Sequence, residues 1–227
     1  MYKVQHRVEP VTERCPMSTE FPSLKRPVRP ESPYLMWRQI CEVSESLAVS
    51  GDLPANREAA LVQLREWEAA GITDVFDMRE EANDTEFIHE NSSITAHWFG
   101  VDDNGGRRDD EWFQNLCHAA SVVLFDSTRP RRLLVHCHMG VNRGPSALFA
   151  IMLATGWESL DALRAIRDAR PIAGIIYASD AINWWAREQG HDTDVVEELV
   201  DEVEAWLERN PLDLYYVIRS IGNRLAK

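Results

Sequence analysis

The sequence is poor in positive charge, and that shortage excludes two classes of partner. Its 227 residues carry 24 lysines and arginines against 37 aspartates and glutamates, which leaves a formal net charge of -13. Nucleic acids and anionic membrane surfaces are bound mainly through Lys and Arg side chains that meet phosphates. The composition therefore predicts no nucleic-acid or membrane partner, although a local basic pocket for a single phosphate is compatible with it.

Long apolar runs and regularly spaced cysteines are also missing. Residues 1–10 have no apolar core of the kind that a signal peptide needs, and the most apolar stretch, residues 147–157, is too short to span a bilayer. The cysteines are scattered, at positions Cys15, Cys41, Cys117 and Cys137. They are interpreted as reduced thiols, which predicts a cytoplasmic protein; the alternative is an exported protein with two disulfides.

Three regions differ in composition. Residues 1–33 are punctuated by prolines and keep no helical or strand period, so they are predicted to be a disordered tail, with order beginning near Tyr34. Residues 34–190 have the patterns of a folded domain. Residues 191–227 are predicted to be a helical extension whose two apolar stripes pack on that domain, with a dimer or protein-binding arm as the alternative. The oligomeric state is left open.

Predicted strands and helices alternate along the main domain. Short apolar segments predict strands over residues 40–49, 72–76, 94–101 and 133–136. Apolar or amphipathic segments predict helices over residues 57–70, 111–126, 145–155, 160–167 and 179–188. Such alternation is typical of an α/β fold, in which a central, mostly parallel sheet is flanked by helices.

The segment Val135–Ser146, Val-His-Cys-His-Met-Gly-Val-Asn-Arg-Gly-Pro-Ser, is the most informative part of the chain. It follows a predicted strand and opens a predicted helix, so backbone N–H groups and the positive end of a helix dipole converge there. A phosphate fits such a place, and the same field can lower the pKa of a cysteine to about 3.5–7.5. Cys137 is therefore predicted to be a nucleophilic thiolate.

Arg143 is the predicted phosphate clamp of this loop. Its planar guanidinium can hold two phosphate oxygens at once, which a lysine cannot copy. Gly140 and Gly144 allow the backbone to curl tightly, and Pro145 suits the first position of a helix. The residues expected to bind phosphate together with Arg143 are His138, Met139, Gly140, Val141 and Asn142.

His136-Cys137, five residues and then Arg143 form the signature of the protein tyrosine phosphatase superfamily, and the chain resembles its dual-specificity branch. The resemblance covers residues 38–188. It also rests on the segments Leu47-Ala48-Val49-Ser50-Gly51, Gly71-Ile72-Thr73-Asp74-Val75 and Trp98-Phe99-Gly100-Val101-Asp102-Asp103-Asn104. It implies a cysteine phosphatase-like fold with residues 34–190 as the catalytic domain, and a phosphocysteine intermediate formed without a metal or cofactor.

The resemblance also implies a general acid on the loop after the strand at residues 94–101. Asp103 is chosen because, in the family's pattern, the second acidic residue of Val101-Asp102-Asp103-Asn104 is the acid; Asp102 is the runner-up. Asp109 and Asp110 are interpreted as first-turn helix residues favoured by the helix dipole. Cys137 would attack phosphorus while Asp103 protonates the leaving oxygen, and Asp103 would then activate the water that hydrolyses the phosphocysteine.

One position departs from the family's pattern. A Ser or Thr usually follows the Arg, where its hydroxyl helps the cysteine to leave, but here that residue is Gly144. Either Ser146 supplies the hydroxyl or none is present, which bears on how fast the intermediate is hydrolysed. His136 is expected to order the loop through a hydrogen bond, and Arg170, followed by Pro171, resembles a residue that braces the loop. No zinc site is predicted, because no second ligand pair has finger spacing.

The expected substrate is a phosphorylated protein, with phosphotyrosine first and some tolerance for phosphoserine and phosphothreonine, as the resemblance implies. Phosphoinositide phosphatases of the superfamily tend to carry Lys in the loop, and this loop has none. Two alternatives stay open. One is a non-protein phosphoester, such as an RNA 5′-phosphate or a small metabolite. The other is a catalytically weak phosphate-binding module on the same fold, which Gly144 favours.

Overall fold

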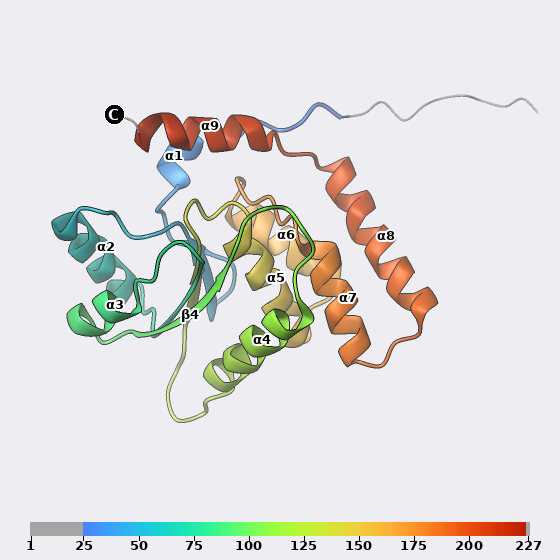
Figure 1. Cartoon of the computed structure of the whole chain (residues 1–227), viewed down its shortest axis with the longest axis horizontal. Coiled ribbons are helices and arrows are strands. Elements are labelled where there is room, and N and C mark those ends of the chain that lie inside the picture. The colour runs from blue at the N-terminus through green and yellow to red at the C-terminus, as the bar shows by residue number, and fades with distance from the viewer. Residues whose placement is uncertain (1–24, 226–227) are drawn as a thin grey trace, which may run out of the picture.

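The computed structural model describes residues 25–225 (Figure 1). Most of the predicted tail, residues 1–24, lies outside the described part, as do residues 226–227. In the part that is described, no helix is both long enough and apolar enough to cross a membrane. The domain boundaries read from the sequence therefore stay a prediction at the N-terminal end.

A five-stranded sheet forms the centre of the molecule, with the order β1-β2-β5-β3-β4. β1 pairs antiparallel with β2, and every other neighbouring pair is parallel. The strands are β1 (Cys41–Glu42), β2 (Leu47–Ser50), β3 (Asp74–Arg79), β4 (Thr95–Val101) and β5 (Leu133–His136). The predicted α/β class, with a mostly parallel sheet flanked by helices, is confirmed.

β5 is the middle strand, and its position decides where the site lies. Its residues are all buried, as expected for a parallel strand covered on both faces. The register places His136 beside Ser50 of β2 and beside Asp77 of β3. Because parallel strands end at the same edge, the segments that follow these three strands meet there, where open α/β sheets bind ligands.

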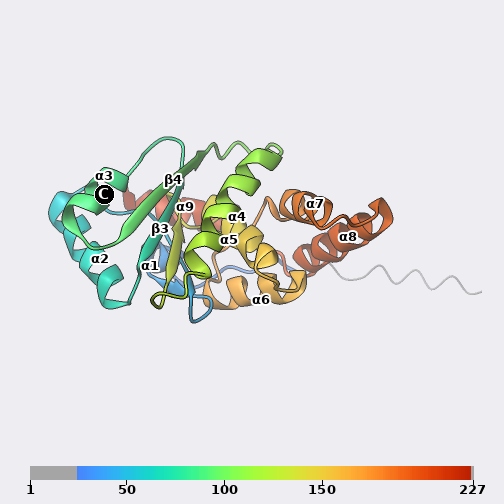
Figure 2. The same cartoon turned by 90° about the horizontal axis from the view of Figure 1, so that it is seen from below.

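Helices cover the two faces of the sheet over separate apolar cores. Figures 1 and 2 show α2 and α3 on one side and α4 to α7 on the other. Their bounds are α2 (Arg57–Ala69), α3 (Thr85–Asn91), α4 (Asp110–Leu124), α5 (Arg143–Ala154), α6 (Ser159–Ala169) and α7 (Ala178–Glu188). α5 is buried from Arg143 to Leu153, because it packs on the sheet and on its neighbouring helices. That burial holds the helix start rigidly beneath the cysteine.

Two short helices were not predicted from the sequence, α1 (Pro33–Met36) and α3. α3 buries a single apolar side chain, Ile88, so its sequence shows no apolar stripe. A helix this short is formed by its tertiary surroundings, since isolated helices shorter than about 12 residues are marginal in water.

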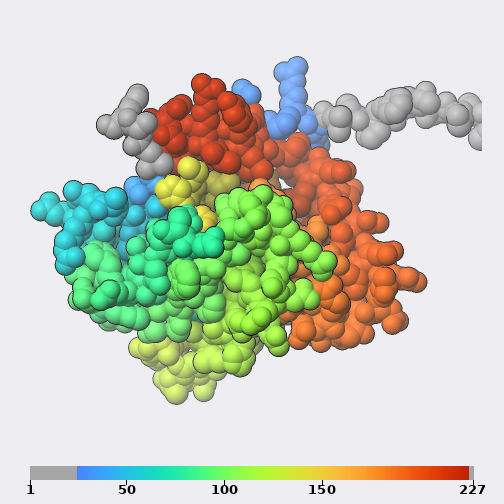
Figure 3. Space-filling view, viewed as in Figure 1, coloured from blue at the N-terminus to red at the C-terminus, as the bar shows by residue number. Residues whose placement is uncertain are grey.

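The C-terminal extension consists of α8 (Thr193–Arg209) and α9 (Leu214–Leu225). α8 buries Val203 in the core shared with α6 and α7, and α9 buries Val217 and Ile221 beside Trp37. The space-filling view shows α9 lying across the yellow segment that contains the cysteine loop (Figure 3). Both apolar stripes thus pack on the rest of the chain.

Residues 25–33, the end of the predicted tail, are structured in contact with the start of α9. The Val28 N–H donates to the Pro211 carbonyl at 2.7 Å, and the Asp213 N–H donates to the Val28 carbonyl at 3.0 Å. Arg29 Nε also donates to Asp213 Oδ2 at 2.7 Å. Order therefore begins before Tyr34, because a distant segment satisfies this backbone, which no local pattern reveals.

Candidate active site

Cys137 lies directly after β5, at the edge of the sheet where the parallel strands end. Its residue is 2% exposed, and it lines a cavity of about 290 Å³, here called the Cys137 cavity. The other sequence-predicted residues that line this cavity are Asp103, His138, Met139, Val141, Asn142 and Arg143. The fold thus brings the predicted nucleophile, clamp and acid to one place.

The loop after Cys137 needs a glycine at position 140. Gly140 has φ +60°, in the left-handed region that glycine adopts without strain. A Cβ at this position would lie 2.5 Å from the Ser50 carbonyl oxygen and would clash with the guanidinium of Arg170. Only the absent side chain lets the loop curl so closely against β2.

Arg170 braces the loop from below, as its resemblance to a family position implied. It is fully buried, and its Nε donates to the Gly140 carbonyl at 2.5 Å. Its Nη2 donates to the carbonyls of Met139 at 3.1 Å and of Trp37 at 2.9 Å. A single planar side chain therefore ties the loop to the segment before β1.

Asn142 is the N-cap of α5, and the helix begins at Arg143, before the predicted start at Pro145. Its side-chain Oδ1 accepts a hydrogen bond from the Ile176 N–H at 2.8 Å, while its Nδ2 donates to Asp103 Oδ1 at 2.6 Å. Besides its predicted place among the phosphate-binding residues, Asn142 thus fixes the position of the candidate acid.

Arg143 keeps one edge of its guanidinium uncommitted. Nη1 donates to Glu81 Oε2 at 2.6 Å and to the Val101 carbonyl at 3.0 Å, and Nη2 donates to Glu81 Oε1 at 2.7 Å. A guanidinium has five N–H donors. The hydrogens left over are those of Nε, which has no hydrogen-bond acceptor among the described residues, and the second one of Nη2. They form a side-on fork that matches two phosphate oxygens.

Glu81 was missed at the sequence level, although a signal for it exists. It is the second residue after β3, and the ends of parallel strands converge at the site edge. Its bidentate hydrogen bond with Arg143 lowers the pKa of its carboxyl to about 2, which keeps the pair charged at neutral pH. Glu81 therefore holds Arg143 by the end opposite its backbone attachment and fixes where the fork lies.

Asp103 is held by two donors that meet the same oxygen. Its Oδ1 accepts from Asn142 Nδ2 and, at 3.0 Å, from the Tyr177 hydroxyl. Its Oδ2 lies 3.5 Å from Arg143 Nε. Tyr177 was also missed, since nothing in its local sequence distinguishes it from a core tyrosine. Within the described residues, Oδ2 is the oxygen that stays available for a proton.

The competing aspartates have other partners. Asp102 does not line the Cys137 cavity, and its carboxylate accepts hydrogen bonds from Arg108 and Asn104. Asp109 is the N-cap of α4, and Asp110 forms an ion pair with Arg187 in the first turn of that helix. Asp110 thus lies in the first turn as predicted, whereas Asp109 lies one position before it, at the N-cap. The geometry favours Asp103 over Asp102.

Ser146 does not take the place of the hydroxyl that Gly144 lacks. It is fully buried outside the lining of the Cys137 cavity, its Oγ donates to Asn142 Oδ1 at 3.2 Å, and it accepts from the Tyr177 N–H at 3.2 Å. Ser146 therefore supports Asn142. A Cβ at Gly144 would lie 3.3 Å from the Cys137 nitrogen, which is tight but leaves the position open to a small side chain.

His136 does not make the hydrogen bond expected of it. The ring is fully buried, and neither ring nitrogen has a hydrogen-bond partner among the described residues. Its Nε2 lies 3.8 Å from Asp77 Oδ1, and its ring centroid lies 5.7 Å from that of Trp67. Burial lowers its pKa, so the ring is neutral and orders the start of the loop by packing.

The electrostatics at Cys137 differ from the sequence expectation. Burial raises the pKa of the thiol, while the Gly144 N–H, the charge of Arg143 and the Gly140 N–H act in the opposite direction. The charge of Asp103 adds to the increase. The predicted lowering of the thiol pKa is not found, because the sulfur has almost no contact with water and the charge of Asp103 lies nearby.

The described residues include one group with the composition of a metal site: Asp77, Asp84 and His136 offer ligand atoms within 4.8 Å of one another. Arg79 lies among them, donating to Asp77 Oδ2 at 2.7 Å and to Asp84 Oδ2 at 2.5 Å. A guanidinium in that position repels a cation and already satisfies the carboxylates. The group is therefore better explained as an ion-pair network that ties β3 to α3.

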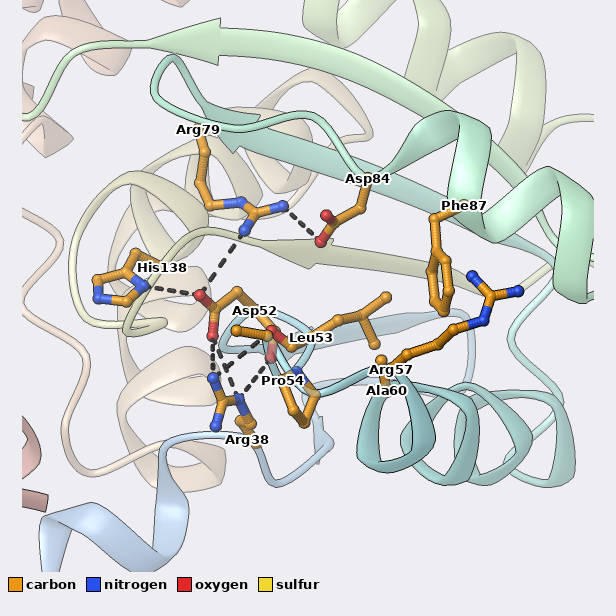
Figure 4. Close-up of a pocket in the computed structure, with 11 residues that line it drawn as sticks. Arg38, Asp52, Leu53, Pro54, Arg57, Ala60, Arg79, Asp84, Phe87 and His138 are labelled. Carbon is orange, nitrogen blue, oxygen red and sulfur yellow. Dashed lines mark hydrogen bonds and ion pairs between the residues drawn. The ribbon is translucent and has the colours of Figure 1, made fainter. Parts of the chain in front are cut away.

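A second pocket, here called the neighbouring pocket, adjoins the Cys137 cavity at His138 and has a volume of about 470 Å³ (Figure 4). Its basic residues are Arg38, Arg57 and Arg79, and its acidic residues are Asp52 and Asp84. Figure 4 shows Asp52 at the centre of the network. It contacts His138 Nδ1 at 2.7 Å, Arg38 at 3.0 Å and Arg79 at 3.6 Å.

The chain is similar to several solved structures, although its sequence matches no known family. No protein-family model matches the chain, and no curated protein matches it. A mouse putative dual specificity phosphatase complexed with zinc tungstate is 16% identical, with 77% of this chain and 98% of that chain covered and a TM-score of 0.54. Human DUSP28 is 17% identical, with coverage of 73% and 99% and a TM-score of 0.53. PTPMT1 in complex with PI(5)P is 16% identical, with coverage of 74% and 97% and a TM-score of 0.50.

At these identities the likeness concerns the fold. The matched structures are covered almost completely, at 99% and 98% of their length. The sequence signature His136-Cys137 to Arg143 falls on the loop that joins β5 to α5. The chain therefore shares its fold with these solved dual-specificity phosphatase structures.

Proposed function

We propose that the protein is a phosphomonoester hydrolase, a protein tyrosine or dual-specificity phosphatase that acts through a phosphocysteine. The observation that carries this proposal is that Cys137, Arg143 and Asp103 line one cavity. One edge of the Arg143 guanidinium carries two N–H donors that are not committed to other partners. A charged fork held in a partly buried site stabilises the transferring phosphoryl group more than it would in water.

The mechanism requires each of the three side chains. The Cys137 thiol first loses its proton to solvent, and the sulfur then attacks phosphorus as the bond to the ester oxygen breaks. Asp103 gives that oxygen the proton carried on Oδ2. In the second step Asp103 takes a proton from water, the water oxygen bonds to phosphorus, and the phosphorus–sulfur bond breaks. Arg143 and the loop N–H groups carry the phosphoryl charge throughout.

A phosphorylated protein is the proposed substrate, with phosphotyrosine preferred. Among the described residues that line the Cys137 cavity, Arg143 is the permanent cation, accompanied by His138. One permanent cation suits one phosphate, whereas a multiply phosphorylated inositol ring would require more. The complex of PTPMT1 with PI(5)P concerns that protein, whose TM-score to this chain is 0.50.

A second candidate is a phosphate-binding module that turns its ligand over slowly. Two observations favour it: burial raises the pKa of the Cys137 thiol, which disfavours the attacking thiolate, and Gly144 offers no hydroxyl for the second step. Both candidates use the same cavity, and they differ only in the rate at which the bound phosphoester is hydrolysed.

Hydrolysis of p-nitrophenyl phosphate in the presence of EDTA tests the proposal. We expect turnover by the wild type, inhibition by vanadate, and no turnover by Cys137→Ser, which should keep its melting temperature and its binding of inorganic phosphate because the loop N–H groups remain. Cys117→Ser is the matched control, since that thiol is buried in α4 outside the cavity.

Three results would contradict or replace the proposal. Normal turnover by Cys137→Ser would show that Cys137 is not the nucleophile. Activity that is lost in EDTA and restored by zinc or magnesium would indicate metal chemistry. A wild type that binds a phosphotyrosine peptide without hydrolysing it would establish the binding module instead.

A further inference from the structure

The C-terminal helix α9 contributes side chains to the Cys137 cavity. Leu214 and Ile218 line it together with Ile176, which precedes α7. Figures 1 and 3 show α9 lying across the molecule above the cysteine loop. The floor of the cavity thus consists of the loop with Arg143 and Asp103, and one wall consists of aliphatic side chains from a segment that the phosphatase signature does not include.

α9 is attached to the molecule at several places. Asp213, which precedes the helix, accepts a hydrogen bond through Oδ1 from the Tyr216 N–H in the first turn, at 2.9 Å. The same carboxylate forms an ion pair with Arg29. Along the helix, Val217 and Ile221 are fully buried in a cluster with Trp37 and the loop residue Val141. The helix is therefore packed directly against the phosphate-binding loop.

The first turn of α9 also touches backbone that is hydrogen-bonded to the loop. A Cβ on Gly174 would lie 2.9 Å from Leu214 Cδ2, so the leucine side chain lies close against this glycine. The Gly174 N–H donates to the carbonyl of Val141 at 2.6 Å. Leu214 therefore lies next to backbone that is hydrogen-bonded to the loop.

Ile218 lines the cavity and is 47% exposed, as is Ile176 at 49%, so both side chains are accessible to a ligand bound there. A phosphate bound by the loop would direct its ester group past Leu214 and Ile218. These side chains offer no hydrogen bonds, so they favour an ester group that is itself apolar and disfavour one that must keep its polar atoms hydrated.

We propose that α9 is a wall of the substrate site, and that Leu214 and Ile218 are specificity-determining residues that select phosphoesters with an apolar aryl group over those with a short polar one. The inference rests on the proposed hydrolase activity. The wall acts by burying apolar surface of the ester group, at about 25 cal/mol per Å². That contact exists before and during the reaction, so its loss raises KM more than it lowers kcat.

The test compares Ile218→Ala with Tyr215→Ala, using 1-naphthyl phosphate and O-phosphoserine as substrates. Tyr215 lies on the same helix, is 72% exposed and does not line the cavity, so its variant is the matched control. For Ile218→Ala we expect kcat/KM to fall about fivefold to tenfold with naphthyl phosphate, mainly through KM, as a few half-exposed apolar groups lose contact. With phosphoserine, and for inhibition by inorganic phosphate, we expect no change.

The outcomes separate this inference from the proposed function. If Ile218→Ala changes kcat/KM equally for both substrates, or for neither, the proposed role of α9 in specificity is wrong. A wild type that hydrolyses neither ester would refute the hydrolase; phenylphosphonate binding, expected to weaken in Ile218→Ala while methylphosphonate binding is retained, would then still test the wall. A dimer in light scattering that Ile218→Asp converts to monomers would show that a second copy covers Ile218, and would also overturn the inference.

Discussion

Two pockets meet at His138, and they use arginine in opposite ways. In the Cys137 cavity Arg143 is held by Glu81 through one end, and the fork on its other edge has no acceptor at Nε among the described residues. In the neighbouring pocket Arg79 is shared by Asp52, Asp77 and Asp84. The neighbouring pocket has more arginines and the larger volume, about 470 Å³ against about 290 Å³.

Uncommitted donors, more than the number of arginines, distinguish a pocket that can bind an anion. Arg38 and Arg79 are partnered by carboxylates, and an incoming phosphate would have to displace these and desolvate them again. Arg57 donates to Asn91 Oδ1 at 3.3 Å and lies at the exposed rim. The Cys137 cavity instead combines one cation with aligned backbone N–H groups, which is a better match for a single phosphate.

The largest effect is expected from a substitution of the candidate acid in the Cys137 cavity. Asp103→Asn should slow the hydrolysis of an ester with a poor leaving group by about 10²–10⁴, because the leaving oxygen is no longer protonated. The loss should shrink for p-nitrophenyl phosphate, and the alkaline limb of the kcat/KM pH profile should disappear. Asp102→Asn is the matched control and should change little. If Asp102→Asn shows these effects and Asp103→Asn does not, the acid is the neighbouring residue.

The next effect compares one arginine from each pocket. Arg143→Lys should lower kcat/KM by about 10²–10³, the range seen when a charge-stabilising donor is removed, because Lys cannot form the bidentate fork. Arg57→Lys in the neighbouring pocket should leave kcat/KM unchanged. Steady-state kinetics with p-nitrophenyl phosphate measure both. A comparable loss in Arg57→Lys would mean that the neighbouring pocket takes part in phosphate binding, and the contrast drawn above would be wrong.

The smallest effect concerns the ion pair that holds Arg143. The pKa of Glu81 is lowered from 4.5 to about 2 by the hydrogen bond from Arg143. A carboxyl whose pKa is lowered in the folded state stabilises the fold above its unfolded value, and that stabilisation is lost as the pH falls from about 4.5 to about 2. The side chain of Glu81 is 53% exposed, so the contribution is at most about 1 kcal/mol.

Urea unfolding as a function of pH measures this contribution. The free energy of unfolding of Glu81→Gln should fall less between pH 4.5 and pH 2 than that of the wild type. Glu80→Gln, at the exposed position next to it, should behave like the wild type. If the free energy of unfolding falls equally between pH 4.5 and pH 2 in the wild type and in Glu81→Gln, the ion pair does not stabilise the fold.

The parts of the site that could be predicted are those that local chemistry specifies. A buried strand, a glycine-rich turn and a helix start place Cys137 and Arg143 on one loop, and the structure keeps them there. Glu81, Tyr177 and the acid-positioning side chain of Asn142 were not predicted in these roles. They come from different elements and meet only through the packing of β3 and α7 around α5, which a single sequence does not state.

The class of fold, the candidate nucleophile and the candidate phosphate-binding loop could be read from the sequence alone, because strand and helix periods and the loop glycines act over short distances. Tertiary structure alone decided that Asp103 and not Asp102 lines the cavity, that Ser146 supports Asn142, and that burial raises the pKa of the Cys137 thiol. It also decided what the stripe of α9 covers. An apolar stripe states that a helix must be buried, whereas the burying surface is chosen by the whole chain.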